Sequence, residues 1–148
     1  KEHPQYAISI SHTQRKGYAA LSFHGPIGID VDLIEDRPIS FVQHCFTSNE
    51  QRQAINARQT TAIWCAKEAV SKLLGIGLRV ATTDIEIYLE SPFRASVILH
   101  HKALRCAQSK KLLPLHIKFT YRESLCLALA HTKYKKLSFQ PIQLLQIG

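Results

Sequence analysis

The chain has 148 residues, of which 45% are hydrophobic and 20% charged, so it is long enough to bury a substantial core. It contains no apolar run of membrane-spanning length, and its first residues lack the charged, apolar and small-residue order of a signal peptide. The formal net charge of +8 favours acidic partners, namely nucleic acid, an anionic membrane, phosphorylated small molecules or an acidic protein. Charge alone does not choose among these partners.

The cysteines indicate no metal or redox motif. All four are widely spaced and none forms a Cys-x-x-Cys pair: Cys45, Cys65, Cys106 and Cys126. Cys65 and Cys126 lie inside apolar segments, which predicts buried thiols and a reducing, cytoplasmic setting.

The start of the chain is unusual. The sequence has no methionine, and normal removal of an initiator would not leave Lys1 as the first residue. We therefore expect residues 1–148 to form a single domain that is a piece of a longer product, or to lack their true start. Either case bears on whether the candidate site is complete.

Three strands are predicted first. Residues 6–11 alternate apolar and small polar side chains, as a half-buried strand does. A plausible turn at 14–17 leads into a second strand at 18–24, and the Gly25-Pro26 break leads into a third at 27–33. Their order predicts an antiparallel meander.

Two helices follow. Ser48 and Gln51 resemble a capping box that opens a short helix over about 49–57. A long helix is expected over 59–74, with Gly75 as its C-terminal stop. Its apolar face is predicted to consist of Ala62, Ala66, Ala69, Val70, Leu73 and Leu74.

The rest of the chain reads as strands, at 85–89, 95–99, 117–121 and 125–131. One dominant helix among strands without parallel-type crossovers is typical of the α+β class. We therefore predict an α+β fold in which an antiparallel sheet packs against one long helix.

The third strand carries two carboxylates on one face. Because side chains alternate along a strand, Asp30 and Asp32 point the same way as Gly28. Such a pair repels unless water screens it or a cation bridges it, and Mg²⁺ typically takes one or two protein carboxylates. The alternative is a half-exposed strand with an acidic outer face.

The long helix adds an acid and two bases. Trp64, Glu68 and Lys72 share one face at i, i+4 and i+8 spacing, which by itself could be a surface pair worth about 0.2–0.5 kcal/mol. Glu68, however, borders the buried stripe, where an unpaired charge is costly, so it needs a metal ion or a lysine. We expect Lys67 and Lys72 to face phosphate oxygens as compact point charges.

Ser9, Ser11 and His12 end the first strand. A histidine that follows small hydroxyl residues at a strand-to-turn junction can donate to a phosphate. This stretch alone, however, favours a histidine that is bonded within its own turn.

Three segments together resemble the motifs of the 4′-phosphopantetheinyl transferases. They are residues 8–13 (ISISHT), 26–32 (PIGIDVD) and 64–72 (WCAKEAVSK). In order and spacing they are similar to the large, surfactin-synthetase-type branch, whose motifs run Ser-His-Ser, Gly-Ile-Asp-x-Glu and Trp-x-x-Lys-Glu-x-x-x-Lys. The likeness covers about residues 6–78. Each motif singly is weakly specific, whereas three in register are strong evidence.

The resemblance implies transfer of the phosphopantetheine arm of coenzyme A to a serine of an apo acyl or peptidyl carrier protein, with release of 3′,5′-ADP. By motif position, Asp30 and Glu68 would bind Mg²⁺, with Asp32 as a third ligand, directly or through water. Glu68 is also the implied base for the incoming serine. The carrier protein is expected to present an acidic helix to the positive surface.

The resemblance also implies the contacts with coenzyme A. Lys72 would contact the pyrophosphate and stabilise charge on the leaving group, with Lys67 also facing phosphate. His12, with Ser11, would hold a phosphate of the coenzyme. These roles agree with chemistry in which a metal offsets developing charge while the protein positions the groups.

The chain departs from the large branch in two respects. Asp32 stands where that branch usually has Glu, which is one methylene longer. Large-branch members also consist of two similar halves with the site between them, and this chain matches the second half plus the end of the first. Either a first half is missing, or the domain assembles with copies of itself, as the small, trimeric branch does.

Two other functions compete with this interpretation. A GT-A glycosyltransferase also has Asp-x-Asp after an apolar strand, but its doubly wound nucleotide-binding region does not fit the meander before Asp30. A non-enzymatic basic module for nucleic acid or an acidic protein explains the charge but not Glu68. Nucleic acid is disfavoured, because the basic clusters do not alternate with aromatic residues. No membrane partner is expected, and the sequence does not choose among fatty-acid, polyketide and peptide synthesis.

Overall fold

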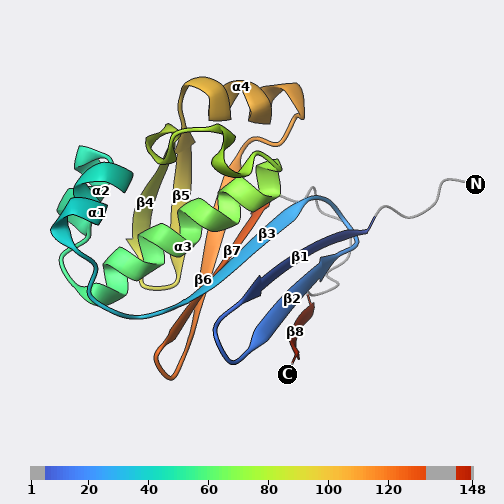
Figure 1. Cartoon of the computed structure of the whole chain (residues 1–148). Helices are drawn as coiled ribbons and strands as arrows, with labels where there is room; N and C mark the ends of the chain where they lie inside the picture. Colours follow the sequence, from blue (N-terminus) through green and yellow to red (C-terminus); the bar gives the residue numbers. More distant parts are fainter. Residues whose placement is uncertain (1–5, 133–142, 148) are drawn as a thin grey trace, which may run out of the picture.

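The computed structural model describes residues 6–132 and 143–147, and in these residues the strands form two antiparallel sheets (Figure 1). The smaller sheet has the order β1-β2-β8, from β1 (Ala7–His12), β2 (Gly17–Ser22) and β8 (Gln143–Ile147). The larger sheet has the order β3-β7-β6-β5-β4, from β3 (Ile27–Leu33), β7 (Leu125–Thr132), β6 (Leu115–Arg122), β5 (Arg94–Leu99) and β4 (Ile85–Ser91).

One long helix, α3 (Ala57–Leu74), crosses a face of the larger sheet and packs on β3 and β7 (Figure 1). The Asn56 side chain accepts a hydrogen bond from the backbone N–H of Gln59 at the start of the helix, and Gly75 ends it in the left-handed conformation. The shorter helices are α1 (Ile39–Cys45), α2 (Ser48–Gln53) and α4 (His101–Ser109), with 3₁₀ turns at η1 (Gly77–Arg79) and η2 (Thr82–Asp84). This arrangement confirms the predicted α+β class.

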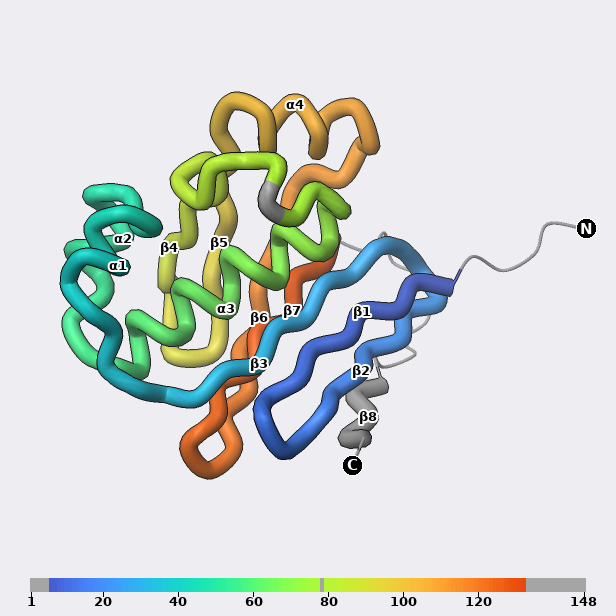
Figure 2. The backbone as a smooth tube through the Cα atoms, viewed as in Figure 1, coloured from blue at the N-terminus to red at the C-terminus, as the bar shows by residue number. Residues whose placement is uncertain are grey.

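The predicted meander is wrong in its pairing. β1 and β2 do form an antiparallel hairpin, but β2 pairs next with β8, and β3 pairs with β7 from Ile27 opposite His131 to Leu33 opposite Leu125. β1 then lies along the outer edge of β3 (Figure 2). The partner of β3 comes about a hundred residues later in the chain, and local alternation carries no information about it.

The predicted capping box is one residue out of place. The Thr47 hydroxyl accepts from the Glu50 N–H, and the Glu50 carboxylate accepts from the Thr47 N–H, so Ser48 already lies inside α2. The helix covers Ser48–Gln53 instead of 49–57. Helices α1 and α4 were not predicted. α1 is only seven residues long, and the buried residues of α4 are two alanines, Ala103 and Ala107.

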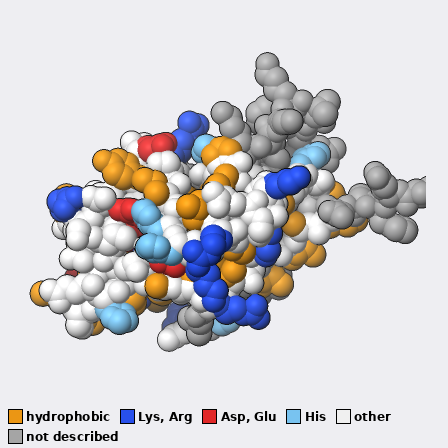
Figure 3. Space-filling view, turned by 90° about the horizontal axis from the view of Figure 1, so that it is seen from above, with side chains coloured by type: hydrophobic (Ala, Val, Ile, Leu, Met, Phe, Trp, Pro, Cys, Tyr) orange, Lys and Arg blue, Asp and Glu red, His pale blue; other side chains and the backbone are white. Residues whose placement is uncertain are grey.

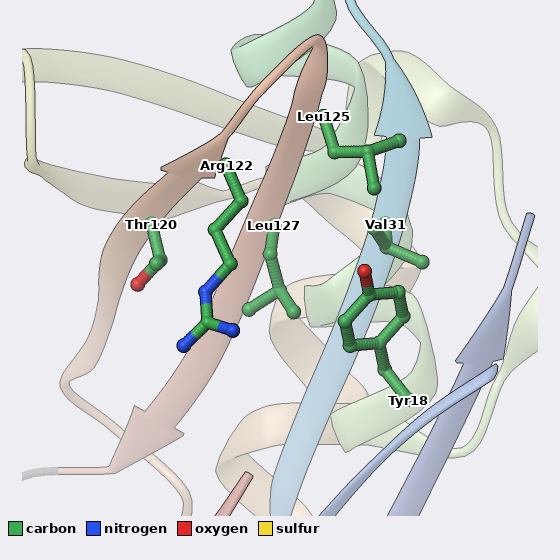
Figure 4. Close-up of a pocket in the computed structure, with 6 residues that line it drawn as sticks. All are labelled: Tyr18, Val31, Thr120, Arg122, Leu125 and Leu127. Atoms are coloured by element: carbon green, nitrogen blue, oxygen red, sulfur yellow. The ribbon is translucent and has the colours of Figure 1, made fainter. Parts of the chain in front are cut away.

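The larger sheet is covered on both faces at β3. Residues of α3 pack on the face that carries Gly28, Asp30 and Asp32, while Ile27, Ile29 and Val31 point the other way. There they join Tyr18 and Ala20 of β2 and Leu127 of β7 in a second apolar cluster. A small recess opens on this second side, lined by Tyr18, Val31, Thr120, Arg122, Leu125 and Leu127 (Figure 4). It therefore lies on the side of β3 opposite the two carboxylates.

The Lys67 side chain is buried in an ion pair. Its Nζ donates to both carboxylate oxygens of Glu50, at 2.6 and 2.7 Å, and to the carbonyl oxygen of Ile85. Glu50 also accepts from the backbone N–H groups of Ile87 and Thr47. Burial lowers the pKa of Lys67, and the Glu50 carboxylate opposes this shift. The pair thus joins α2, α3 and β4 inside the protein.

Two further predictions concern the interior and membranes. Cys65 and Cys126 are free and buried, as their apolar surroundings predicted. In the part of the chain that the structure describes, no helix is both long and apolar enough to cross a membrane.

Replacing Gly28 should test the contact between α3 and β3. A Cβ at Gly28 would lie 1.9 Å from the carbonyl oxygen of Ala69 and 2.7 Å from the backbone nitrogen of Leu73. Because backbone cannot move as a flexible side chain does, we expect Gly28→Ala to lower the free energy of unfolding by about 1–3 kcal/mol or more. Urea denaturation followed by circular dichroism measures this change.

Gly77→Ala is the control for backbone strain without crowding. Gly77 has a φ of +50°, and a Cβ added there would meet no atom within 4 Å, so only conformational strain of about 1–2 kcal/mol is expected. Equal stability of the Gly28→Ala variant and the wild-type protein would contradict the close approach of α3 to β3.

Breaking the buried ion pair should also be costly. We expect Lys67→Met to lower the free energy of unfolding by about 3–5 kcal/mol, because it leaves the Glu50 carboxylate buried without a counter-charge. The same substitution at Lys102, which is exposed on α4, should change stability by about 0.5 kcal/mol or less. Urea denaturation of both variants provides the comparison, and equal losses would show that the pair is not a stabilising element.

Candidate active site

The candidate site forms where α3 lies across β3. Asp30 of β3 faces the helix, and its Oδ1 accepts a hydrogen bond from Lys72 Nζ at 2.9 Å. Lys72 Nζ also donates to the carbonyl oxygen of Ile29 at 3.0 Å and to that of Ile10 in β1 at 3.3 Å. The ammonium group of Lys72 is therefore held by both neighbouring strands, and it remains partly exposed.

Glu68 lies one helical turn before Lys72 and is half-buried. Burial raises the pKa of the Glu68 carboxyl, the negative charge of Asp30 raises it further, and Lys72 opposes these shifts. The charge of Asp30 therefore acts on the half-buried Glu68 carboxyl. Such a pair favours binding of a cation or a proton.

Asp32 is turned toward a different partner. Its Oδ2 accepts from the Arg37 guanidinium, and its Oδ1 accepts from the backbone N–H of Leu33 at 2.8 Å. Arg37 in turn lies over the ring of Phe41, which packs edge-to-face on Trp64 of α3. Asp32 is thus paired with Arg37, which in turn lies on the Phe41–Trp64 aromatic contact.

The three predicted metal ligands do not converge on one point. In residues 6–132 and 143–147, no group of three or more His, Cys, Asp or Glu side chains is placed to hold a metal ion together. The charge of Asp30 acts on Glu68, and Asp32 is paired with Arg37. The metal ligands therefore stay a prediction.

Lys67 was expected to face phosphate oxygens, and its burial contradicts that expectation. Its side chain is 1% exposed and donates to Glu50 and to the Ile85 carbonyl. Successive helix residues are separated by about 100° around the helix axis, so Lys67 points into the core while Glu68 points to the site. Glu50 was not predicted, since neither the motif nor the spacing marks it as the partner of Lys67.

The two residues predicted at the end of β1 differ in their surroundings. Ser11 is buried, and its hydroxyl donates to Asp30 Oδ1 at 3.0 Å. His12 is exposed at the end of the strand, opposite Gly17 in the hairpin. Ser11 is thus brought to the carboxylate pair, whereas His12 lies at the surface beside it.

A basic surface continues beyond the C-terminal end of α3. Lys and Arg side chains gather on the face seen in Figure 3, and the exposed basic residues of this region belong to η1, α4 and the segment after it: Arg79, Lys102, Arg105, Lys110 and Lys111. Lys110 Nζ donates to the carbonyl oxygen of Leu74 at 2.6 Å, which places this surface at the end of the helix that carries Lys72. Only Lys110 and Lys111 form a visible cluster in the sequence, because the fold assembles the others.

The chain is similar in sequence to bacterial holo-[acyl-carrier-protein] synthases. It is 31% identical over 137 residues to that of Magnetococcus marinus, covering 78% of this chain and 98% of the relative. It is 34% identical over 116 residues to that of Alkaliphilus oremlandii, and the match covers 70% of this chain and 95% of the relative. It is also 30% identical over 118 residues to the fatty acid synthase subunit alpha of Candida albicans. That match covers 73% of this chain but only 6% of the subunit.

Solved structures share the fold. The structure of Helicobacter pylori holo-[acyl-carrier-protein] synthase in complex with coenzyme A matches with a TM-score of 0.61 at 17% identity, covering 72% of this chain and 99% of that one. That of the Thermotoga maritima enzyme matches with a TM-score of 0.60 at 24% identity, covering 76% and 66%. At these identities the likeness supports the fold alone.

The family comparison covers most of the chain. Residues 26–130 match the ACPS family, described as the 4′-phosphopantetheinyl transferase superfamily. The relatives above are of the holo-[acyl-carrier-protein] synthase type, so neither the large surfactin-synthetase-type branch nor the half-chain interpretation is confirmed. The glycosyltransferase alternative is excluded by the same match. With its fold, its carboxylate pair and its sequence in agreement, the chain belongs to the 4′-phosphopantetheinyl transferase superfamily.

Proposed function

We propose that the protein transfers the 4′-phosphopantetheine group of coenzyme A to a serine of an apo carrier protein, with Mg²⁺, and releases 3′,5′-ADP. The observation that carries this proposal is the Lys72–Asp30 ion pair where α3 crosses β3, with Glu68 one helical turn before Lys72 and its pKa raised in part by the charge of Asp30. These residues hold the motif positions that the family resemblance marks for metal and pyrophosphate. The holo-[acyl-carrier-protein] synthases that the chain resembles support the same chemistry.

The residues present fit Mg²⁺. This ion prefers oxygen ligands and usually takes one or two carboxylates, with water and substrate phosphate completing its shell. The pKa of Glu68 is raised beside Asp30, and a cation between the two carboxylates would relieve their repulsion. When bound, Mg²⁺ would offset charge on the phosphate oxygens. We assign Asp30 and Glu68 as direct ligands and Asp32, which is paired with Arg37, as an indirect one.

The protein side chains then do the rest of the chemistry. The carrier serine oxygen forms a bond to the phosphorus that bears the pantetheine arm, and the bond from this phosphorus to the oxygen of 3′,5′-ADP breaks. The serine proton passes to the Glu68 carboxylate, directly or through water. Lys72, whose three N–H groups donate to Asp30, Ile29 and Ile10, acts beside the pyrophosphate through its positive charge and stabilises the negative charge that develops on the departing oxygen.

The charge distribution supports the choice of partner. The net charge of +8 and the basic surface on η1 and α4 favour an acidic carrier protein and the phosphates of coenzyme A. We propose that His12, exposed at the end of β1, holds a phosphate of the coenzyme. We propose a cytoplasmic location, which fits the free cysteines.

The branch of the superfamily is also a proposal. This domain matches 95% and 98% of the two synthases named above, which supports the small branch over the large one. Self-association of the domain therefore remains an expectation of the resemblance. The chain spans 6% of the fatty acid synthase subunit that it matches.

A transfer assay tests the proposed function. The protein is incubated with coenzyme A, Mg²⁺ and an apo carrier protein, and the intact mass of the carrier is measured. We expect the mass to rise by one phosphopantetheine group, and chelation by EDTA to stop the reaction. A carrier whose acceptor serine is replaced by alanine should stay unmodified. An unchanged mass of the intact carrier would refute the proposal.

Substitutions in the same assay test the ligand assignment. We expect Asp30→Asn and Glu68→Gln each to slow transfer by about 10²–10³-fold, as for the loss of a preorganised electrostatic group. Asp32→Asn should cost less, because its carboxylate is engaged by Arg37. Glu90→Gln, an exposed carboxylate of β4, is the matched control and should leave the rate unchanged. A larger loss for Asp32→Asn than for Asp30→Asn would reverse the assignment.

A further inference from the structure

Strands β1 and β3 are joined by side chains in place of a backbone ladder. Each lies at the edge of its own sheet, so the outward N–H groups of β3 need acceptors from elsewhere. Two serine hydroxyls of β1 supply them. The N–H of Ile29 donates to Ser9 Oγ at 2.9 Å, and the N–H of Val31 donates to Ser11 Oγ at 3.1 Å. Both serines are buried, with exposed fractions of 7% and 5%.

Ser11 makes one contact that Ser9 does not share among the described hydrogen bonds. Its hydroxyl donates to Asp30 Oδ1 at 3.0 Å, the same oxygen that accepts from Lys72 Nζ at 2.9 Å. Two donors on one carboxylate oxygen fix the rotation of the carboxylate group. Ser11 and Lys72 together therefore set the orientation that Asp30 presents to Glu68 and to a cation.

The hydrogen count of the hydroxyl limits what else Ser11 can do. A serine hydroxyl has one hydrogen and two lone pairs. The hydrogen is directed to Asp30, and one lone pair accepts from Val31. The hydroxyl therefore has no second hydrogen to donate to a phosphate, which was the role that the resemblance implied for Ser11.

The hairpin that carries Ser11 lies outside the family match. That match begins at residue 26, whereas β1 and β2 cover Ala7–His12 and Gly17–Ser22. The same hairpin also supplies the Ile10 carbonyl that accepts from Lys72. β1 thus contacts both members of the Asp30–Lys72 pair.

We propose that Ser11 is a positioning residue for Asp30. Through Ser11, strand β1 forms part of the site. The inference rests on the proposed function for its catalytic consequence, while the contact itself can be tested in protein without substrate. Ser11 acts through Asp30 and makes no contact with coenzyme A.

Ser9 provides a matched control. Ser9→Ala and Ser11→Ala each remove a hydroxyl that joins β1 to β3, so both should lower the urea midpoint, Ser11→Ala by more because it also loses the bond to Asp30. Only Ser11→Ala removes a hydrogen bond to Asp30. We expect Ser11→Ala to raise the Mg²⁺ concentration for half-maximal transfer by about 10–100-fold, as losses of outer-shell partners do. Ser9→Ala should leave this concentration unchanged, and neither variant should change the KM for coenzyme A.

Two outcomes of that comparison would overturn the proposal. Equal Mg²⁺ dependence of the two variants would mean that Ser11 only joins the strands. A raised KM for coenzyme A in Ser11→Ala, with unchanged Mg²⁺ dependence, would mean that Ser11 contacts phosphate. If Ser11→Ala does not fold, Ser11→Cys fills the same buried space with a weaker donor, and a smaller shift in the same direction is expected.

A measurement without metal or substrate separates this proposal from the proposed function. In a double-mutant cycle by urea denaturation, Ser11→Ala and Asp30→Ala should be non-additive, since each removes one partner of the same hydrogen bond. Ser9→Ala and Asp30→Ala should combine closer to additively. Additivity of the Ser11 and Asp30 substitutions would overturn the contact, whether or not the wild-type protein transfers phosphopantetheine. Coupling in a protein that fails the transfer assay would refute the proposed function alone.

Discussion

Helix α3 rests directly on the backbone of strand β3, and the site depends on this contact. At Gly28 the two elements are so close that a Cβ would lie 1.9 Å from the Ala69 carbonyl oxygen. Two residues further along the same face, Asp30 is therefore within reach of the helix and accepts from Lys72. A larger residue at Gly28 would lift the helix and separate the charges that the chemistry needs. The glycine is thus a structural requirement of the active-site geometry.

The adjacent residues Lys67 and Glu68 of α3 point in different directions and have different roles. Lys67 points inward to Glu50 and joins three elements in the interior, whereas Glu68 points to Asp30 at the edge of the solvent. A buried ion pair fixes how the helix is seated, and the neighbouring carboxylate benefits from that fixed position. The Lys-Glu pair of the motif therefore combines a residue of the core with a residue of the site, in a helix that is itself clamped by β1 and β3 through Lys72.

Much of the fold and part of the site could be predicted from the sequence. The alternation in 27–33 placed Asp30 and Asp32 on one face, and the spacing of Trp64, Glu68 and Lys72 placed them on one face of the long helix. These predictions rest on the local geometry of strands and helices. The pairing of β3 with β7, and the place of β1 beside β3, depend on contacts between distant segments and were not predicted.

By itself, the sequence determined which residue types stand on which face of each element, because strand and helix periods are properties of the local backbone. Only the tertiary structure decided their partners. Arg37 pairs with Asp32, Glu50 binds Lys67 in the core, and Asp30 accepts the single hydroxyl hydrogen of Ser11. A charged or polar side chain binds the group that the fold brings nearest in a desolvated space, and that group can come from any part of the chain.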